Sequence, residues 1–119
     1  PRGPVYERLE RGENVILEIE VQGALQIREK CPEAVLVFVL PPSLKELERR
    51  LVDRNTEDRE TVDRRLSAAA EEIRMAYQYD YVVVNDALDD AVQELKTIFA
   101  AEKLKAANRK KMIDEVLEL

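Results

Sequence analysis

Three arginines in the charged stretch "RRLVDRNTEDRETVDRRL", residues 49–66, have a spacing suited to binding a phosphate chain. Arg50 and Arg54 are one helical turn apart and therefore share a helix face, and Arg65 lies on the flank of the next predicted helix. If the two helices pack together, the three guanidinium groups converge, and each offers paired donors with a permanent charge. In phosphoryl transfer such a clamp neutralises the charge of the transition state.

A second interpretation of the same stretch is a solvated surface whose arginines pair with neighbouring acids. The acids available in this stretch are Asp53, Glu57, Asp58 and Asp63. Exposed charge runs are commonly of this kind, and each such pair contributes little to stability. The residues by themselves leave both interpretations open.

Two carboxylates stand together in "LEIEVQG", residues 17–23, directly after an apolar run. We expect a strand from Val15 to Glu20, in which Glu18 and Glu20 point to the same face near the strand end. A small residue, Gly23, follows. The pair is therefore a candidate for contact with a ligand at the edge of a sheet, with local salt bridging as the alternative.

The elements that position these residues alternate between strands and helices along the chain. The apolar run "AVLVFVL", residues 34–40, predicts a strand buried on both faces of a parallel sheet. Ser43 and Glu46 form a predicted capping box at the start of the next helix. The remaining predicted elements are helices at 22–29, 59–77, 89–107 and 108–119, and a strand at 81–84.

Such a series predicts a parallel sheet covered by helices, whose ligands bind beyond the carboxyl ends of the strands. The polar residues expected at those ends are Glu18, Glu20, Asn85 and Asp86.

Composition limits the functions open to the chain. Its 119 residues are 45% hydrophobic and carry a net charge of −6, which does not favour a general nucleic-acid binder. The absence of histidine excludes a histidine base or a histidine-ligated metal. The single cysteine, Cys31, excludes an internal disulfide and fits a reducing, cytoplasmic compartment. No apolar run has the length of a membrane span. The first residue is Pro1, so we expect a piece of a longer protein.

The chain resembles the C-terminal part of a guanylate kinase. The motifs that carry the resemblance are "VILEIEVQGA", "VFVLPPSLKELERRL", "RNT" followed by "RRL", and "YDYVVVND", in this order and spacing. The resemblance implies an α/β fold of the P-loop NTPase class, with a parallel sheet core and a helical lid. It implies core segments at 1–42 and 77–107, a lid region at 43–76 and a helical tail at 108–119.

The resemblance also implies roles for particular residues. Arg50, Arg54 and Arg65 would be the lid arginines over the ATP phosphates, and Asn85 would lie beside adenine. Glu18 would contact guanine of GMP, and Glu20 stands where the family usually has an aspartate near magnesium and phosphates. In the lid turn, Asn55 stands where the family usually has glycine. The phosphate-binding loop G-x-x-x-x-G-K-[ST] is absent from these residues.

The implied activity is transfer of the ATP γ-phosphoryl group to GMP or dGMP, with Mg²⁺, by a protein that could form homo-oligomers. Without the phosphate-binding loop, we expect the 119 residues alone to be inactive. One alternative is a guanylate-kinase-like interaction module, against which the retained lid arginines argue. Another is a related kinase with a sugar-phosphate acceptor.

Overall fold

The computed structural model describes residues 15–54 and 58–119, which divide into two compact units, Pro1–Ala34 and Val35–Leu119. In the first unit, α2 (Val21–Lys30) is the one helix of the described residues. The second unit contains β1 (Val37–Leu40), α3 (Leu44–Arg54), α4 (Arg59–Arg74), β2 (Tyr81–Val84), α5 (Leu88–Leu104) and α6 (Lys110–Leu117). Two short 3-10 helices, η1 (Met75–Gln78) and η2 (Ala106–Asn108), follow α4 and α5.

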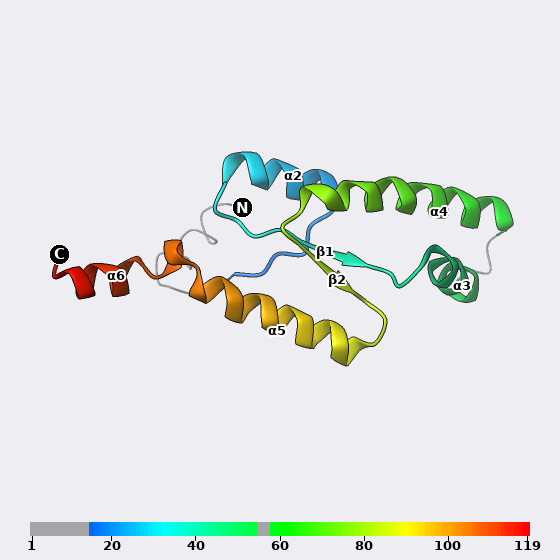
Figure 1. Cartoon of the computed structure of the whole chain (residues 1–119). Coiled ribbons are helices and arrows are strands. Elements are labelled where there is room, and N and C mark those ends of the chain that lie inside the picture. The colour runs from blue at the N-terminus through cyan, green and yellow to red at the C-terminus, as the bar shows by residue number, and fades with distance from the viewer. Residues whose placement is uncertain (1–14, 55–57) are drawn as a thin grey trace. The chain divides into compact units, whose positions relative to one another are not determined.

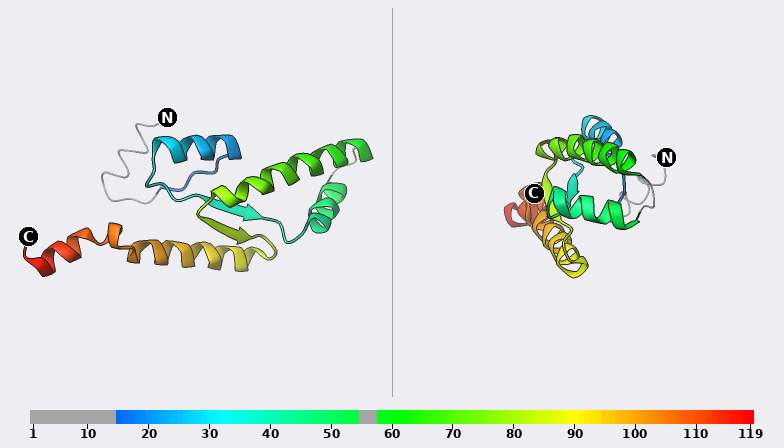
Figure 2. Two further views of the ribbon diagram at one scale, coloured as in Figure 1. Left: turned by 45° about the horizontal axis from the view of Figure 1, so that its top comes forward. Right: turned by 90° about the vertical axis from the view of Figure 1, so that its right-hand side faces the viewer.

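The sheet of the second unit consists of β1 and β2, which run parallel with Val37 beside Tyr81 and Leu40 beside Val84. Parallel strands need a long connection, which is usually helical. Here it contains α3 and α4, which pack against each other. Figure 1 shows α4 and α5 on opposite sides of the strand pair, and the views in Figure 2 agree. The predicted parallel α/β arrangement is confirmed, and β2 has the predicted bounds.

Backbone and side-chain hydrogen bonds fix both ends of the strand pair. At the start, the Asp80 carboxylate accepts the Leu36 N–H at 2.8 Å, and the Tyr81 N–H donates to the Leu36 carbonyl at 3.1 Å. At the other end, the Asn85 N–H donates to the Leu40 carbonyl at 2.8 Å. Asn85 is therefore held where the strands end, which is the ligand-binding edge of such sheets.

The core of this unit is small. Val83 is 1% exposed and Phe38 is 9% exposed, and the Phe38 ring packs edge-on against Tyr79 with 5.1 Å between ring centroids. By contrast, Val39 is 55% exposed, so the prediction of a strand buried on both faces is wrong for this chain. A parallel sheet buries both faces only where helices pack over the side chains of each face, and the Val39 side chain is not covered in this way.

The predicted strand from Val15 to Glu20 is also wrong, because residues 15–20 have no regular secondary structure. Alternating side chains favour extended backbone, but a strand exists only where a neighbour accepts and donates its hydrogen bonds. Among the described residues, pairing of this kind involves only β1 and β2.

Candidate nucleotide site

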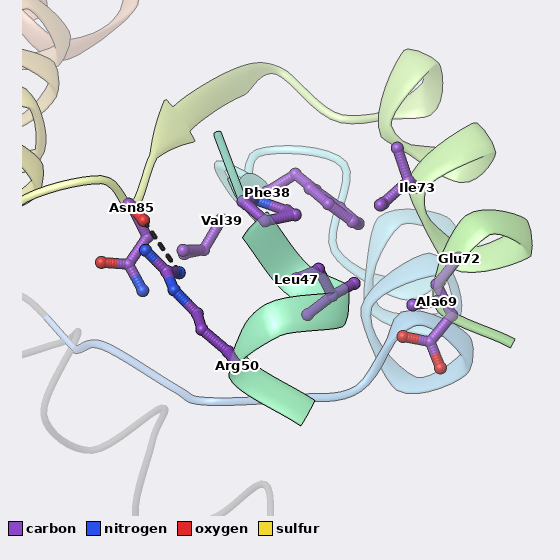
Figure 3. Close-up of a pocket in the computed structure, with 9 residues that line it drawn as sticks. Phe38, Val39, Leu47, Arg50, Ala69, Glu72, Ile73 and Asn85 are labelled. Carbon is purple, nitrogen blue, oxygen red and sulfur yellow. Dashed lines mark hydrogen bonds between the residues drawn. The ribbon is translucent and has the colours of Figure 1, made fainter. Parts of the chain in front are cut away.

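A pocket of about 260 Å³ opens at the carboxyl ends of β1 and β2, beside α3 and α4 (Figure 3). Its walls are mostly apolar, with polar groups contributed by Arg50, Glu72 and Asn85. The apolar lining consists of Phe38, Val39, Pro41, Leu47, Ala69 and Ile73. A concave apolar site with a few convergent polar groups is the usual form of a small-molecule site.

Arg50 is the cationic residue in the lining of this pocket. Its Nη1 donates to the Asn85 carbonyl at 3.2 Å, and Figure 3 shows the side chain reaching from α3 to the residue after β2. Its Nε donates to Glu46 Oε1 at 3.3 Å. A guanidinium carries five N–H donors, so three remain without a bond to the described residues. Arg50 and Asn85 therefore line one pocket, and their roles toward a nucleotide stay a prediction.

Arg54 and Arg65 are exposed and do not line the pocket. Arg54 occupies the last turn of α3, one turn beyond Arg50, and has no ion-pair partner within the described residues. Arg65 lies near the middle of α4. Asn55 and Glu57 lie outside the described residues, so the expectation for Asn55, which stands where the family usually has glycine, stays a prediction.

Other arginines of the same stretch belong to the solvated-surface interpretation. Arg49 pairs with Glu46 and, at 2.8 Å, with Asp53. Arg59 pairs with Glu48 at 3.2 Å and with Asp63 at 2.9 Å. Arg49 and Arg59 are therefore outward arginines bound to local acids, whereas Arg50, which also pairs with Glu46, is directed toward the strand ends.

The sequence predicts that Glu46 belongs to a capping box, and in the structure its carboxylate binds two arginines instead. The Glu46 N–H donates to Ser43 Oγ at 3.0 Å, which confirms half of the box. Its carboxylate does not cap the Ser43 N–H but binds Arg49 and Arg50. The hydrogen bonds from Arg49, with the positive charges of Arg49 and Arg50, hold the pKa of this carboxyl below its ordinary value.

The two acids of "LEIEVQG" do different things in the first unit. Glu20 is the N-cap of α2, with its carboxylate accepting the N–H of Gly23 at 2.7 Å and of Gln22 at 3.2 Å. A Cβ on Gly23 would stand 2.6 Å from Ile19 Cγ2, so a larger residue here would require the Ile19 side chain to move. Glu18 is exposed. The expectation that both share one face of a strand is therefore wrong, because the backbone turns into a helix at Glu20.

The described residues contain no group of three acidic, cysteine or histidine side chains that could hold a metal ion. None of the described helices combines the length and the apolar character that a membrane crossing requires.

Two parallel strands with a pocket at their carboxyl ends and helices on both sides are typical of the α/β class of proteins, whose ligands bind at that edge. The crystal structure of guanylate kinase from Anaplasma phagocytophilum is similar, with a TM-score of 0.77 at 28% identity. The similarity covers 100% of this chain and 58% of that one. The fold is thus that of the P-loop NTPases, as predicted.

Sequence comparison narrows the class to one family. The guanylate kinase family model matches residues 3–102. A guanylate kinase of Thermus thermophilus is 51% identical over 119 residues, which is 100% of this chain and 52% of the relative. Guanylate kinase of Oceanobacillus iheyensis is 52% identical over 118 residues, which is 99% of this chain and 57% of the relative. The chain belongs to the guanylate kinase family, and it spans about half the length of these curated relatives.

Proposed function

We propose that the whole protein, meaning the full product of the gene, transfers the γ-phosphoryl group of ATP to GMP or dGMP and releases ADP and GDP or dGDP. The observation that carries the proposal is Arg50, held by Glu46 and by the Asn85 carbonyl at the ligand edge of a guanylate-kinase-family sheet. Three N–H donors of this guanidinium are left for an anionic ligand.

The pocket fits the base end of ATP. Pockets that enclose a drug-sized ligand begin at about 300 Å³, so the 260 Å³ here suits part of a nucleotide. Phe38, Leu47 and Ile73 offer apolar surface to a planar ring. The Asn85 side-chain amide, exposed at the mouth of the pocket, can donate to and accept from the edge of adenine.

The phosphate end would be served by the lid region, residues 43–76. Arg50 and Arg54 share a face of α3, and Arg65 follows on α4. In our proposal they close over the ATP phosphates and stabilise the charge that spreads over the transferred group. Such chemistry requires positioning and electrostatics but no covalent intermediate.

The GMP end would involve Glu18 and Glu20. An ionised carboxylate has about four lone-pair sites, and the α2 cap uses only two on Glu20. Both acids can therefore accept from the N–H groups of guanine or from water near the phosphates. Mg²⁺ would accompany ATP, whose phosphates are oxygen ligands of the kind it prefers.

The test compares the whole protein with the 119-residue chain in a coupled assay for ADP release, with and without GMP. We expect GMP-dependent turnover from the whole protein and none from the chain alone, since its sequence has no phosphate-binding loop. A folded whole protein without GMP-dependent turnover would indicate an interaction module. Turnover with a sugar phosphate in place of GMP would indicate the other kinase class.

A further inference from the structure

The carboxylate of Glu46 does not make the hydrogen bond that is usual for an acid at this position of a helix start. In a capping box the acid at this position accepts the N–H of the capping residue. Here the Ser43 hydroxyl caps the Glu46 N–H at 3.0 Å, and the Glu46 carboxylate instead accepts from two arginines. The helix start is therefore capped without this side chain, which is available for another role.

The Glu46 carboxylate is itself held in place. Arg49 binds it through both oxygens, with Nη2 at 2.5 Å from Oε1 and Nε at 3.0 Å from Oε2. Arg49 is in turn held by Asp53 at 2.8 Å. A two-pronged contact of this kind fixes the plane of the carboxylate as well as its distance.

The fixed Oε1 is also the acceptor for Arg50 Nε, at 3.3 Å. Arg50 is thereby anchored at two points, on its own helix by Glu46 and across the pocket by the Asn85 carbonyl. With one anchor a long arginine side chain still rotates, whereas two anchors restrict the plane of its remaining donors. A preformed orientation reduces the ordering that a ligand must impose.

We propose that Glu46 is a positioning residue that orients Arg50 toward the phosphate chain of the bound nucleotide. This inference rests on the proposed function. Glu46 touches no ligand itself and acts only through the arginine.

The first test is Glu46→Gln in the whole protein. A glutamine can keep an oxygen at the position of Oε1, but its NH2 group would face Arg49 Nε in place of Oε2, so the two-pronged contact that fixes the acceptor of Arg50 is lost together with the negative charge. We expect kcat to fall on the order of 10-fold, as is typical for loss of a group that orients a functional residue. The Michaelis constant for GMP should not change, because Glu46 acts on the ATP side only.

The matched control is Glu48→Gln, which removes the same charge from the same helix. Glu48 also pairs with an arginine, Arg59, at 3.2 Å, but neither residue lines the pocket. We expect this variant to keep the parental kcat. An equal loss of kcat in both variants would overturn the inference, because it would show that kcat depends only on the number of negative charges on α3.

The decisive test is a double-mutant cycle with Arg50→Ala. If Glu46 acts through Arg50, then Glu46→Gln has no further effect once Arg50 is gone, and the double variant matches Arg50→Ala. If the two residues had independent roles, the fold-losses of kcat in the single variants would multiply in the double variant, and this result would overturn the inference. If Glu46→Gln does not fold, Glu46→Asp takes its place in the cycle, because its shorter side chain draws the carboxylate away from Arg50.

The outcomes separate the two proposals. A whole protein without GMP-dependent turnover contradicts the proposed function. A fully active whole protein whose Glu46→Gln variant keeps its kcat, or whose cycle is multiplicative, contradicts only the positioning role of Glu46.

Discussion

Replacing Arg54 by alanine in the whole protein is the sharpest test of the phosphate clamp. Arg54 is exposed at the end of α3 and makes no ion pair within the described residues. Its removal should therefore change the free energy of unfolding by less than about 0.5 kcal/mol. If the side chain contacts the transferring phosphoryl group, kcat should fall on the order of 10²–10³-fold, or about 2.7–4 kcal/mol.

Arg59→Ala is the matched control, since Arg59 is an exposed arginine of the same stretch. It pairs with Glu48 and Asp63, and all three side chains are exposed. Exposed pairs contribute about 0–1 kcal/mol to stability and none of the chemistry. We therefore expect a small loss of stability at most, with the parental kcat.

Steady-state kinetics with ATP varied at saturating GMP, together with urea unfolding, measure both quantities. Loss of a contact made only in the transition state lowers kcat and kcat/KM together. If Arg54→Ala retains near-parental kcat, the phosphate-clamp assignment fails for this residue, and the solvated-surface interpretation extends to it. Equal losses in both variants would indicate a general effect of positive charge.

Two further predictions concern stability. Val83→Ala removes two buried methyl groups at a position 1% exposed, so urea unfolding should show a loss of about 2–3 kcal/mol. Val82→Ala, at a position 46% exposed on the same strand, should cost clearly less, and equal costs would contradict the assigned core. The second prediction concerns Glu102, where a hydrogen bond from Lys105 and then one from Tyr81 hold the pKa below its ordinary value of 4.5. Because the folded pKa is the lower one, its stabilisation is present above pH 4.5 and is lost as the pH falls through the folded value. Unfolding of Glu102→Gln should therefore depend less on pH below 4.5, and an unchanged pH profile would count against the contact.

The arginine stretch illustrates why one motif supports two interpretations. Glu46 lies within reach of both Arg49 and Arg50, and the same helix turn presents one arginine to solvent and the next to the pocket. Counting charges along the sequence does not separate them, because the distinction depends on which side of α3 faces β2.

The sequence by itself determined the features that depend on a single segment or on a familiar order of segments. The bounds of β2, the helix that follows it, and the parallel α/β arrangement all follow from local apolar periodicity and strand–helix alternation. Membership of the guanylate kinase family followed from motifs in a fixed order, and the family match confirms it.

Tertiary structure decided the features that need a partner from elsewhere in the chain. Arg50 and the Asn85 carbonyl are 35 positions apart and meet only because β1 and β2 end at the same edge. Val15–Glu20 has the alternation of a strand, yet it is not one, because a strand also requires a neighbour to satisfy its backbone. Glu46 has the sequence of a cap, but two cations compete more strongly for its carboxylate than one backbone N–H does. The local sequence limits the secondary structures and contacts that each segment can form. The groups that the fold brings within hydrogen-bonding distance determine which of these structures and contacts occur.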